Sequence, residues 1–179
     1  MADSRSALIG ILQLAYSGEL AAAYAYRGHS RSVSLPAERA RIRQIEDEEW
    51  HHRRLVGGLL ESLGAGPDRR REMRAAMIGR TLGFLCHVAG WFMPMYGAGK
   101  LESRNIREYE LAAGFARDCA RADMIDCLLG MAEVEWEHEE FFRSKVLSHR
   151  WSRRIAVWPQ PPPKESIRAA FAEELRQAN

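Results

Sequence analysis

Two short motifs in this chain place a glutamate three residues before a histidine. Glu49 precedes His52, and Glu135 precedes His138. In a helix of 3.6 residues per turn, side chains three positions apart lie on one face, one above the other. A carboxylate and an imidazole placed in this way can bind one cation together. Two such pairs, with one carboxylate from each of two further helices, form the ligand set of a dinuclear metal site in a four-helix bundle.

Glu19 and Glu102 are the candidates for the two further carboxylates. Each interrupts a stripe of apolar residues at helical spacing: Glu19 stands between Ala15 and Ala22, and Glu102 stands four residues before Ile106. Carboxylates are rarely buried without a compensating partner. We therefore predict a metal site with the ligands Glu19, Glu49, His52, Glu102, Glu135 and His138.

Other acidic and histidine residues near these positions fit a solvated surface better. Glu48 and His51 repeat the three-residue spacing, but they line up with polar residues such as Gln44, so we expect them to face water. Glu108 and Glu110 each lie close to an arginine on the same helix, which favours surface ion pairs. His149 is expected to mark a helix end.

Four carboxylates buried together need compensating charge. Without cations they would repel one another and lose hydration, at a cost of several kcal/mol per ion. Two divalent cations would balance four carboxylates and leave both histidines neutral. Carboxylate and imidazole ligands suit iron or manganese, and zinc also binds them. The alternative is a hydrated bundle interior, or a helical phase that is wrong by one residue.

The hydrophobic periodicity predicts an all-α fold in which four long helices carry these residues. Ser34 is expected to cap the second helix, with Pro36 in its first turn. A Pro-rich linker and a final amphipathic helix should follow the bundle, which we place in residues 1–150, with 151–179 as the C-terminal segment. The expected helices span residues 4–29, 34–63, 68–80 (short and basic), 124–148 and 166–177, and a further bundle helix, with its stripe starting at Met95, continues to about residue 118.

Residues 81–99 form an uncharged run whose length is close to that of a membrane span. Its glycines and Pro94 argue against a span and favour a buried or interfacial helix, with contact to a bilayer surface left open. We expect the helix to kink or restart at Pro94 and at the glycines Gly97 and Gly99.

Composition limits the partners and the cellular compartment that we expect for the protein. The 179 residues include 26 basic and 24 acidic side chains, for a formal net charge of +2. This near balance gives no reason to expect a nucleic-acid partner. Cys86, Cys119 and Cys127 form no CxxC pair, which fits a reducing compartment better than a disulfide framework. With no convincing signal peptide, we expect a cytoplasmic protein, with membrane association left open.

The order of these residues resembles that of the ferritin-like di-iron carboxylate superfamily, which is Glu, ExxH, Glu, ExxH along the chain. The resemblance covers roughly residues 5–148, and within the superfamily the demethoxyubiquinone hydroxylase group is most similar. The segment Gly18 to Leu20, followed by Tyr26 to His29, is similar to that group's first helix. So is the wide spacing between His52 and Glu102, which contains an apolar stretch.

This resemblance implies a ferritin-like four-helix bundle with a long crossover before its third helix and additional short helices. It also implies two iron ions and activation of O2, with hydroxylation of an apolar or quinone-like substrate. The hydroxylase group carries a His-Tyr pair after its third-helix Glu, where this chain has Glu108 and Tyr109. Tyr109 would then support the metals or relay electrons, unless it is simply a core residue. The resemblance predicts the metal site more specifically than the substrate.

The same site admits other functions. Ferroxidase or rubrerythrin-like peroxide-scavenging activity would use the same ligands, and so would a bundle that a metal only stabilises. An oxygenase also needs an electron-donor protein or another reductant, because the sequence has no flavin or nicotinamide fingerprint and no rubredoxin-like cysteine spacing. Apolar residues near Trp91 and in the final helix make a homodimer a further expectation.

Overall fold

The computed structural model describes residues 2–178, without the side chains of residues 2, 175 and 178. All regular secondary structure in this range is helical, which confirms the all-α prediction. The helices are α1 (Ala2–Ser32), α2 (Pro36–Ser62), α3 (Arg69–Leu85), α4 (Phe92–Asp118), α5 (Ala122–Ser148), the 3-10 helix η1 (Arg150–Arg153) and α6 (Glu165–Ala178).

The chain forms two compact units, one of residues 9–94 and the other of residues 1–8 with 95–179. The ferritin-like arrangement of the bundle and the expected boundary near residue 150 stay predictions.

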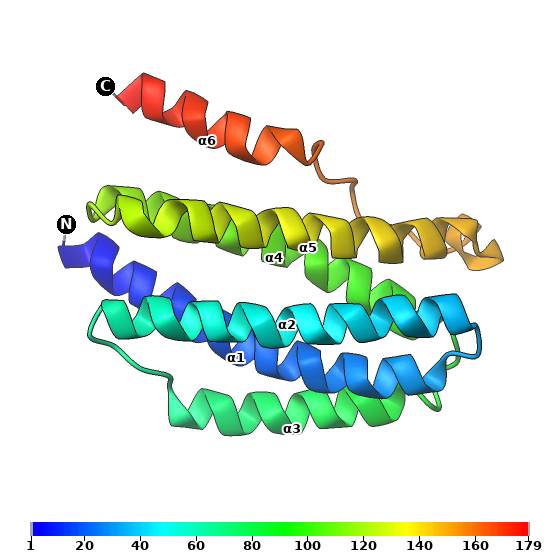
Figure 1. Ribbon diagram of the computed structural model, residues 1–179. Coiled ribbons are helices and arrows are strands. Elements are labelled where there is room, and N and C mark those ends of the chain that lie inside the picture. Colours follow the sequence, from blue (N-terminus) through cyan, green and yellow to red (C-terminus); the bar gives the residue numbers. More distant parts are fainter. Residues whose placement is uncertain (1, 179) are drawn as a thin grey trace. The chain divides into compact units, whose positions relative to one another are not determined.

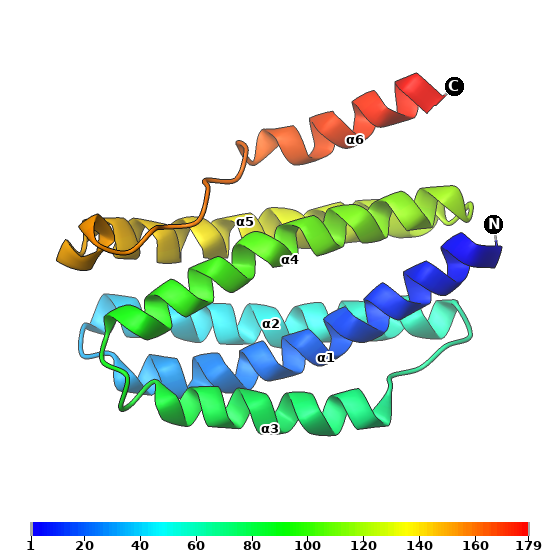
Figure 2. The ribbon, with the colours of Figure 1, turned by 180° about the vertical axis from the view of Figure 1, so that it is seen from behind.

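In the unit of residues 9–94, the helices α1, α2 and α3 lie side by side (Figures 1 and 2). A short turn joins α1 to α2, which run antiparallel. α3 packs against α1 through small residues, because a Cβ atom at Gly79 would overlap the backbone of Ala21, and one at Gly28 would overlap Gly83. Leu12, Tyr26, Ile42, Ile45, Val56 and Leu60 are among the residues of the apolar core in this unit.

The ends of α2 follow local chemistry, with one correction to the expected cap. Pro36 occupies the first turn, where backbone N–H groups have no acceptor within the helix, so proline's lack of an N–H costs nothing. The N-cap is Leu35, with extended backbone and no side-chain hydrogen bond, so the prediction that Ser34 caps the helix was wrong. Beyond the last turn, Gly64 has a φ of +64°, a conformation that glycine adopts without steric cost.

The uncharged run of residues 81–99 is divided between two helices, as expected, but the break lies earlier than the expected restart at Pro94. α3 continues to Leu85, and the break lies before Pro94, where Gly90 has a φ of +74°. Pro94 falls in the first turn of α4, a position that tolerates proline because its N–H would have no helical acceptor. The two expected alternatives were a buried helix and an interfacial one. Phe84 and Val88 are both 67% exposed, so this part of the run is not buried, and the interfacial alternative stays a prediction.

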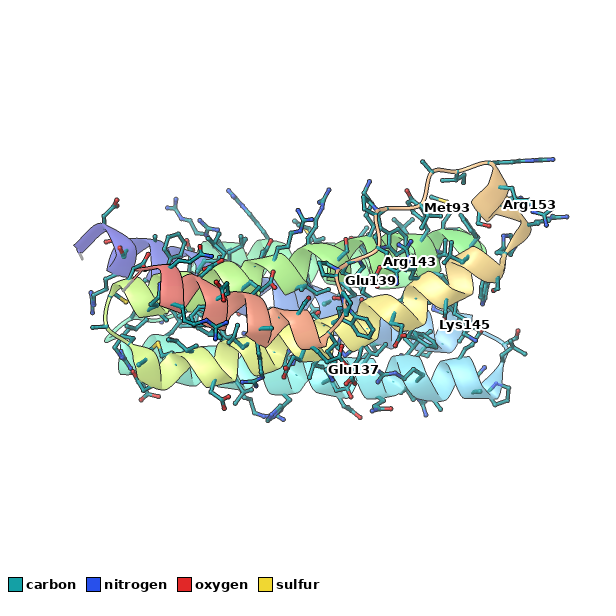
Figure 3. All side chains as sticks on the ribbon, turned by 90° about the horizontal axis from the view of Figure 1, so that it is seen from above. Met93, Glu137, Glu139, Arg143, Lys145 and Arg153 are labelled. Atoms are coloured by element: carbon teal, nitrogen blue, oxygen red, sulfur yellow. The ribbon has the colours of Figure 1, made fainter. Side chains whose placement is uncertain are left out.

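In the second unit, α4 and α5 run antiparallel and side by side (Figures 1 and 2). Ala120, with a φ of +58°, forms part of the tight connection between them. After η1 the chain runs back along α5 as an extended segment and reaches α6 (Figure 3). This return is anchored by Trp158, whose ring occupies the space beside Gly99 where any Cβ atom would collide with it.

One helical segment, Asp3–Ser32, is long and apolar enough to cross a bilayer by length and composition. The core helix of a water-exposed protein passes the same test. Leu8, Leu12, Ala23 and Tyr26 of this helix are indeed buried against the protein itself. The cellular location of the chain stays a prediction.

Candidate metal-binding site

Glu19 of α1 and the pair Glu49 and His52 of α2 come together within the unit of residues 9–94. Each offers one ligand atom, and these atoms lie within 4.8 Å of one another. The His52 Nδ1 atom is 4.0 Å from the Oε1 atom of Glu19. At most 3% of the surface of each residue is exposed. We call these three residues the first triad.

Contacts between α1 and α2 fix the register that forms the first triad. On one side of Glu19, the guanidinium of Arg53 donates to the Tyr16 carbonyl and stacks 3.6 Å from the centroid of the Tyr16 ring. On the other side, the rings of Tyr24 and Trp50 meet edge to face with their centroids 5.7 Å apart. Arg53 and Trp50 adjoin the ligands of α2 in the sequence, so these contacts hold α2 in place at the triad.

Glu102 of α4 and the pair Glu135 and His138 of α5 form a second triad, in the other unit. Their ligand atoms also lie within 4.8 Å of one another. The His138 Nδ1 atom is 3.7 Å from the Oε2 atom of Glu135. All three residues are fully buried. Each unit therefore brings together three of the six predicted ligands, namely two glutamates and one histidine.

Asn105 connects the two carboxylates of the second triad and was not anticipated from the sequence. Its Nδ2 atom lies 2.9 Å from Glu102 Oε2 and 3.3 Å from Glu135 Oε2, so the amide donates toward both helices. The sequence does contain a spacing that indicates this contact. Asn105 follows Glu102 by three residues, the same spacing that separates Glu and His in the two motifs. An amide donor fixes carboxylate orientation without adding charge.

The donor set of each triad fits a bound divalent cation. Two carboxylates this close in a buried site disfavour each other's ionised form, and loss of hydration adds several kcal/mol per ion. A dication would offset both charges and leave the imidazole neutral, with a lone pair for the metal. Oxygen and imidazole ligands suit iron, manganese or zinc. Among the residues described, no cysteine belongs to either group. These buried glutamates and histidines could therefore hold metal ions.

The competing residues on α2 and α5 behave as predicted. Glu48 accepts hydrogen bonds from Arg41 Nη1 at 3.0 Å and from Gln44 Nε2 at 2.8 Å, and His51 is exposed. His149 ends α5, with its Nδ1 atom accepting from the Trp151 amide at 3.2 Å. These residues lie outside both triads.

The three α4 residues considered in the sequence analysis besides Glu102 differ in burial. Glu108 and Glu110 are half-buried and lie outside the second triad. Burial raises the pKa of Glu110, and the charge of Arg107 partly offsets this effect. Tyr109 is 2% exposed, and so belongs to the core of its unit. A role for Tyr109 in electron transfer or metal support stays a prediction.

A second buried carboxylate network adjoins the second triad on α5. Glu139 directly follows His138 and accepts a hydrogen bond of 2.5 Å from the Trp158 indole. Arg143 lies 3.7 Å from the same Glu139 oxygen and donates to the Trp158 carbonyl at 2.7 Å. Figure 3 shows Glu139 and Arg143 on α5 where the extended segment crosses it. Burial raises the pKa of Glu139, while Trp158 and Arg143 oppose that rise. No helical spacing links residue 158 to α5, so this contact could not be predicted from the sequence.

Two further buried polar residues lie in the unit of residues 9–94. The Trp91 indole donates to Glu38 Oε2 over 2.8 Å, and Glu38 is 3% exposed. His29 is also buried, and the loss of hydration lowers its pKa to about 4. A histidine with this pKa is neutral at physiological pH.

No protein-family model, curated protein or solved structure matches this chain. The chemistry of the two triads is therefore the basis on which a function can be proposed.

Proposed function

We propose that each triad binds one metal ion, and that the chain is a di-iron carboxylate oxidoreductase of the ferritin-like type. The observation that carries this proposal is the repetition of one ligand set. Each unit independently assembles two buried glutamates and one buried histidine within 4.8 Å. Such repetition is typical of dinuclear carboxylate sites in helical bundles, where each half supplies a lone Glu and an ExxH pair.

The protein side chains have defined parts in this proposal. Glu19, Glu49, Glu102 and Glu135 supply negative charge that balances two dications, and His52 and His138 supply neutral nitrogen ligands. Asn105 holds the carboxylates of Glu102 and Glu135 in a fixed relative orientation. Complete burial keeps bulk water from the ligands, which strengthens their electrostatic interactions. Iron, when bound, would supply the redox chemistry with O2 that these side chains lack.

We further propose an apolar or quinone-like organic substrate, and electrons from a separate reductant. The resemblance described above supports this substrate class, and the near-neutral composition offers no competing signal for a nucleic-acid substrate. The carboxylate and imidazole ligands lack any thiolate, and this favours iron or manganese over a soft metal.

Oxygen consumption by the iron-loaded protein tests the oxidoreductase assignment. The protein is loaded anaerobically with Fe(II), supplied with a reductant, and followed with an oxygen electrode with and without a short-chain quinone analogue. A hydroxylase consumes oxygen in proportion to the added substrate and forms a hydroxylated product detectable by mass spectrometry. Oxygen uptake that follows only the amount of Fe(II) would assign ferroxidase activity instead. Metal binding with no oxygen uptake would leave a structural site.

A further inference from the structure

α3 presents its large apolar side chains outward and its small ones inward. The residues in contact with the protein interior are Ala75, Gly79 and Gly83. By contrast, five large apolar residues of α3 and the following turn are between 52% and 71% exposed: Met73, Met77, Ile78, Phe84 and Val88. An exposed apolar surface of this extent on one helix marks an interaction site. We call these five residues the α3 apolar face.

The packing of α3 against α1 shows that this orientation is built in. A Cβ atom at Gly79 would overlap the Ala21 backbone, and one at Gly83 would lie 2.8 Å from the Tyr24 carbonyl oxygen. The helices can approach this closely only because glycine lies between them. Rotating α3 to bury Met77 or Phe84 would destroy this contact. The α3 apolar face is therefore exposed because of how α3 packs on α1.

Positive charge accompanies the apolar side chains. Residues 68–88 contain five arginines and two carboxylates. Asp68 accepts from the backbone amides of the first turn as the N-cap, and Glu72 pairs with Arg53 of α2. Arg71 Nε lies 3.6 Å from Asp68 Oδ2, and the Arg80 guanidinium lies 4.6 Å from the Tyr24 ring centroid. The positive charge beside the apolar side chains is therefore chiefly that of the exposed Arg69, Arg70 and Arg74.

We propose that α3 and the turn after it dock on the surface of an anionic lipid bilayer. An amphipathic helix with arginines beside exposed apolar side chains lies in the interface between headgroups and acyl chains, and anionic headgroups attract its basic residues. A second copy of this chain is a poorer occupant, because a symmetric contact would place the same arginines opposite one another. This inference does not depend on the metal centre.

Vesicle flotation of the full chain tests the proposal. The wild-type protein is expected to float with phosphatidylcholine vesicles that contain phosphatidylglycerol, and to bind pure phosphatidylcholine vesicles far more weakly. The substitutions Met77→Ser, Phe84→Ser and Val88→Ser, made together, should weaken binding at least about tenfold, because each removes apolar area that would enter the bilayer. Arg70→Gln with Arg74→Gln should weaken binding about 25-fold at low salt, since one basic residue near an anionic surface is worth about a factor of five.

Matched control variants test whether vesicle binding depends on the α3 apolar face and its arginines, rather than on total charge or total exposed apolar area. Arg150→Gln with Arg153→Gln removes the same charge from a second exposed arginine cluster, on η1. Leu35→Ser with Leu147→Ser removes exposed apolar residues elsewhere, which are 56% and 51% exposed. Both control variants should keep wild-type binding, and all variants should keep their helical circular dichroism.

The proposal is overturned by no flotation at low salt, or by equal losses in the control variants. It is also overturned if the Met77, Phe84 and Val88 variant abolishes a concentration-dependent dimer while no variant affects vesicle binding.

Discussion

Glu48 and Glu49 are neighbours in the chain, but their side chains lie in opposite environments on α2. Glu49 is fully buried in the first triad, whereas Glu48 accepts hydrogen bonds from Arg41 and Gln44 on the outer side of the helix. A change at Glu49 therefore has a matched control one residue away, with the same chemistry and the same helix.

The first prediction concerns stability without metal. Glu49→Gln should stabilise the metal-free protein by about 1–2 kcal/mol, because it removes one of two charges buried together. It should also reduce the additional stability that a bound dication confers. Urea unfolding with a chelator, and again with Mn(II), measures both effects. Glu48→Gln should change either value by less than about 0.5 kcal/mol. Equal shifts for the two variants would contradict the burial of a charge pair at Glu49.

The second prediction concerns Asn105. Asn105→Ala should weaken metal binding about 10- to 100-fold, as loss of a partner that orients ligands does in other metal sites. Isothermal titration with Mn(II) gives the dissociation constant. Ser103→Ala is the control on the same helix, because the Ser103 hydroxyl donates only to the Lys100 carbonyl one turn back. If Asn105→Ala binds metal as tightly as Ser103→Ala, the amide does not organise the second triad.

The third prediction concerns the anchor of the C-terminal segment. Trp158→Ala should cost about 3–5 kcal/mol, because it leaves a cavity beside Gly99 and Phe142 and takes the indole donor from Glu139. Trp151→Ala removes an indole that is 38% exposed and should cost about 1 kcal/mol or less. Chemical denaturation of both variants provides the comparison. Equal costs would show that the extended segment is not fixed through Trp158.

The fourth prediction concerns pH. Burial lowers the pKa of His29 from 6.5 to about 4, so between these values the unfolded chain binds a proton that the folded chain does not. Stability from this residue is complete above about pH 6.5 and is lost as the pH falls toward 4, by about 3 kcal/mol in total. His29→Gln should remove that slope from the unfolding free energy, measured at pH 7 and pH 4.5. His51→Gln, at an exposed position, should leave it unchanged. A slope that persists in His29→Gln would contradict the assignment.

Helical phase explains how much of the site was predictable from the sequence. The stripe on α2 distinguishes Glu49 and His52 from Glu48 and His51, because a difference of one residue rotates a side chain by 100°. The ends of α2 likewise follow from local signals, with Pro36 in the first turn and Gly64 just after the last. The position of α3 does not follow from phase alone. The close approach of Gly79 to Ala21 turns its small residues inward, and this contact is not visible in the sequence of α3 alone.

Contacts between distant segments account for the remaining surprises. Trp158 reaches Glu139 only because the extended segment folds back along α5, and Asn105 matters because α4 and α5 lie close enough for one amide to reach both. Pro94 suggested a break at its own position, whereas the first turn of a helix accepts proline and the break lies at Gly90. Each of these features depends on tertiary packing, which overrides local sequence preference.

Metal stoichiometry under anaerobic conditions tests the central claim most directly. Protein titrated with Fe(II), passed over a desalting column and assayed for iron should retain about two ions per chain, the capacity of a dinuclear carboxylate site. Glu49→Ala should retain about one or none, and Glu48→Ala should retain the wild-type amount. Fewer than two ions in the wild-type protein, together with no difference between Glu49→Ala and Glu48→Ala, would contradict the account.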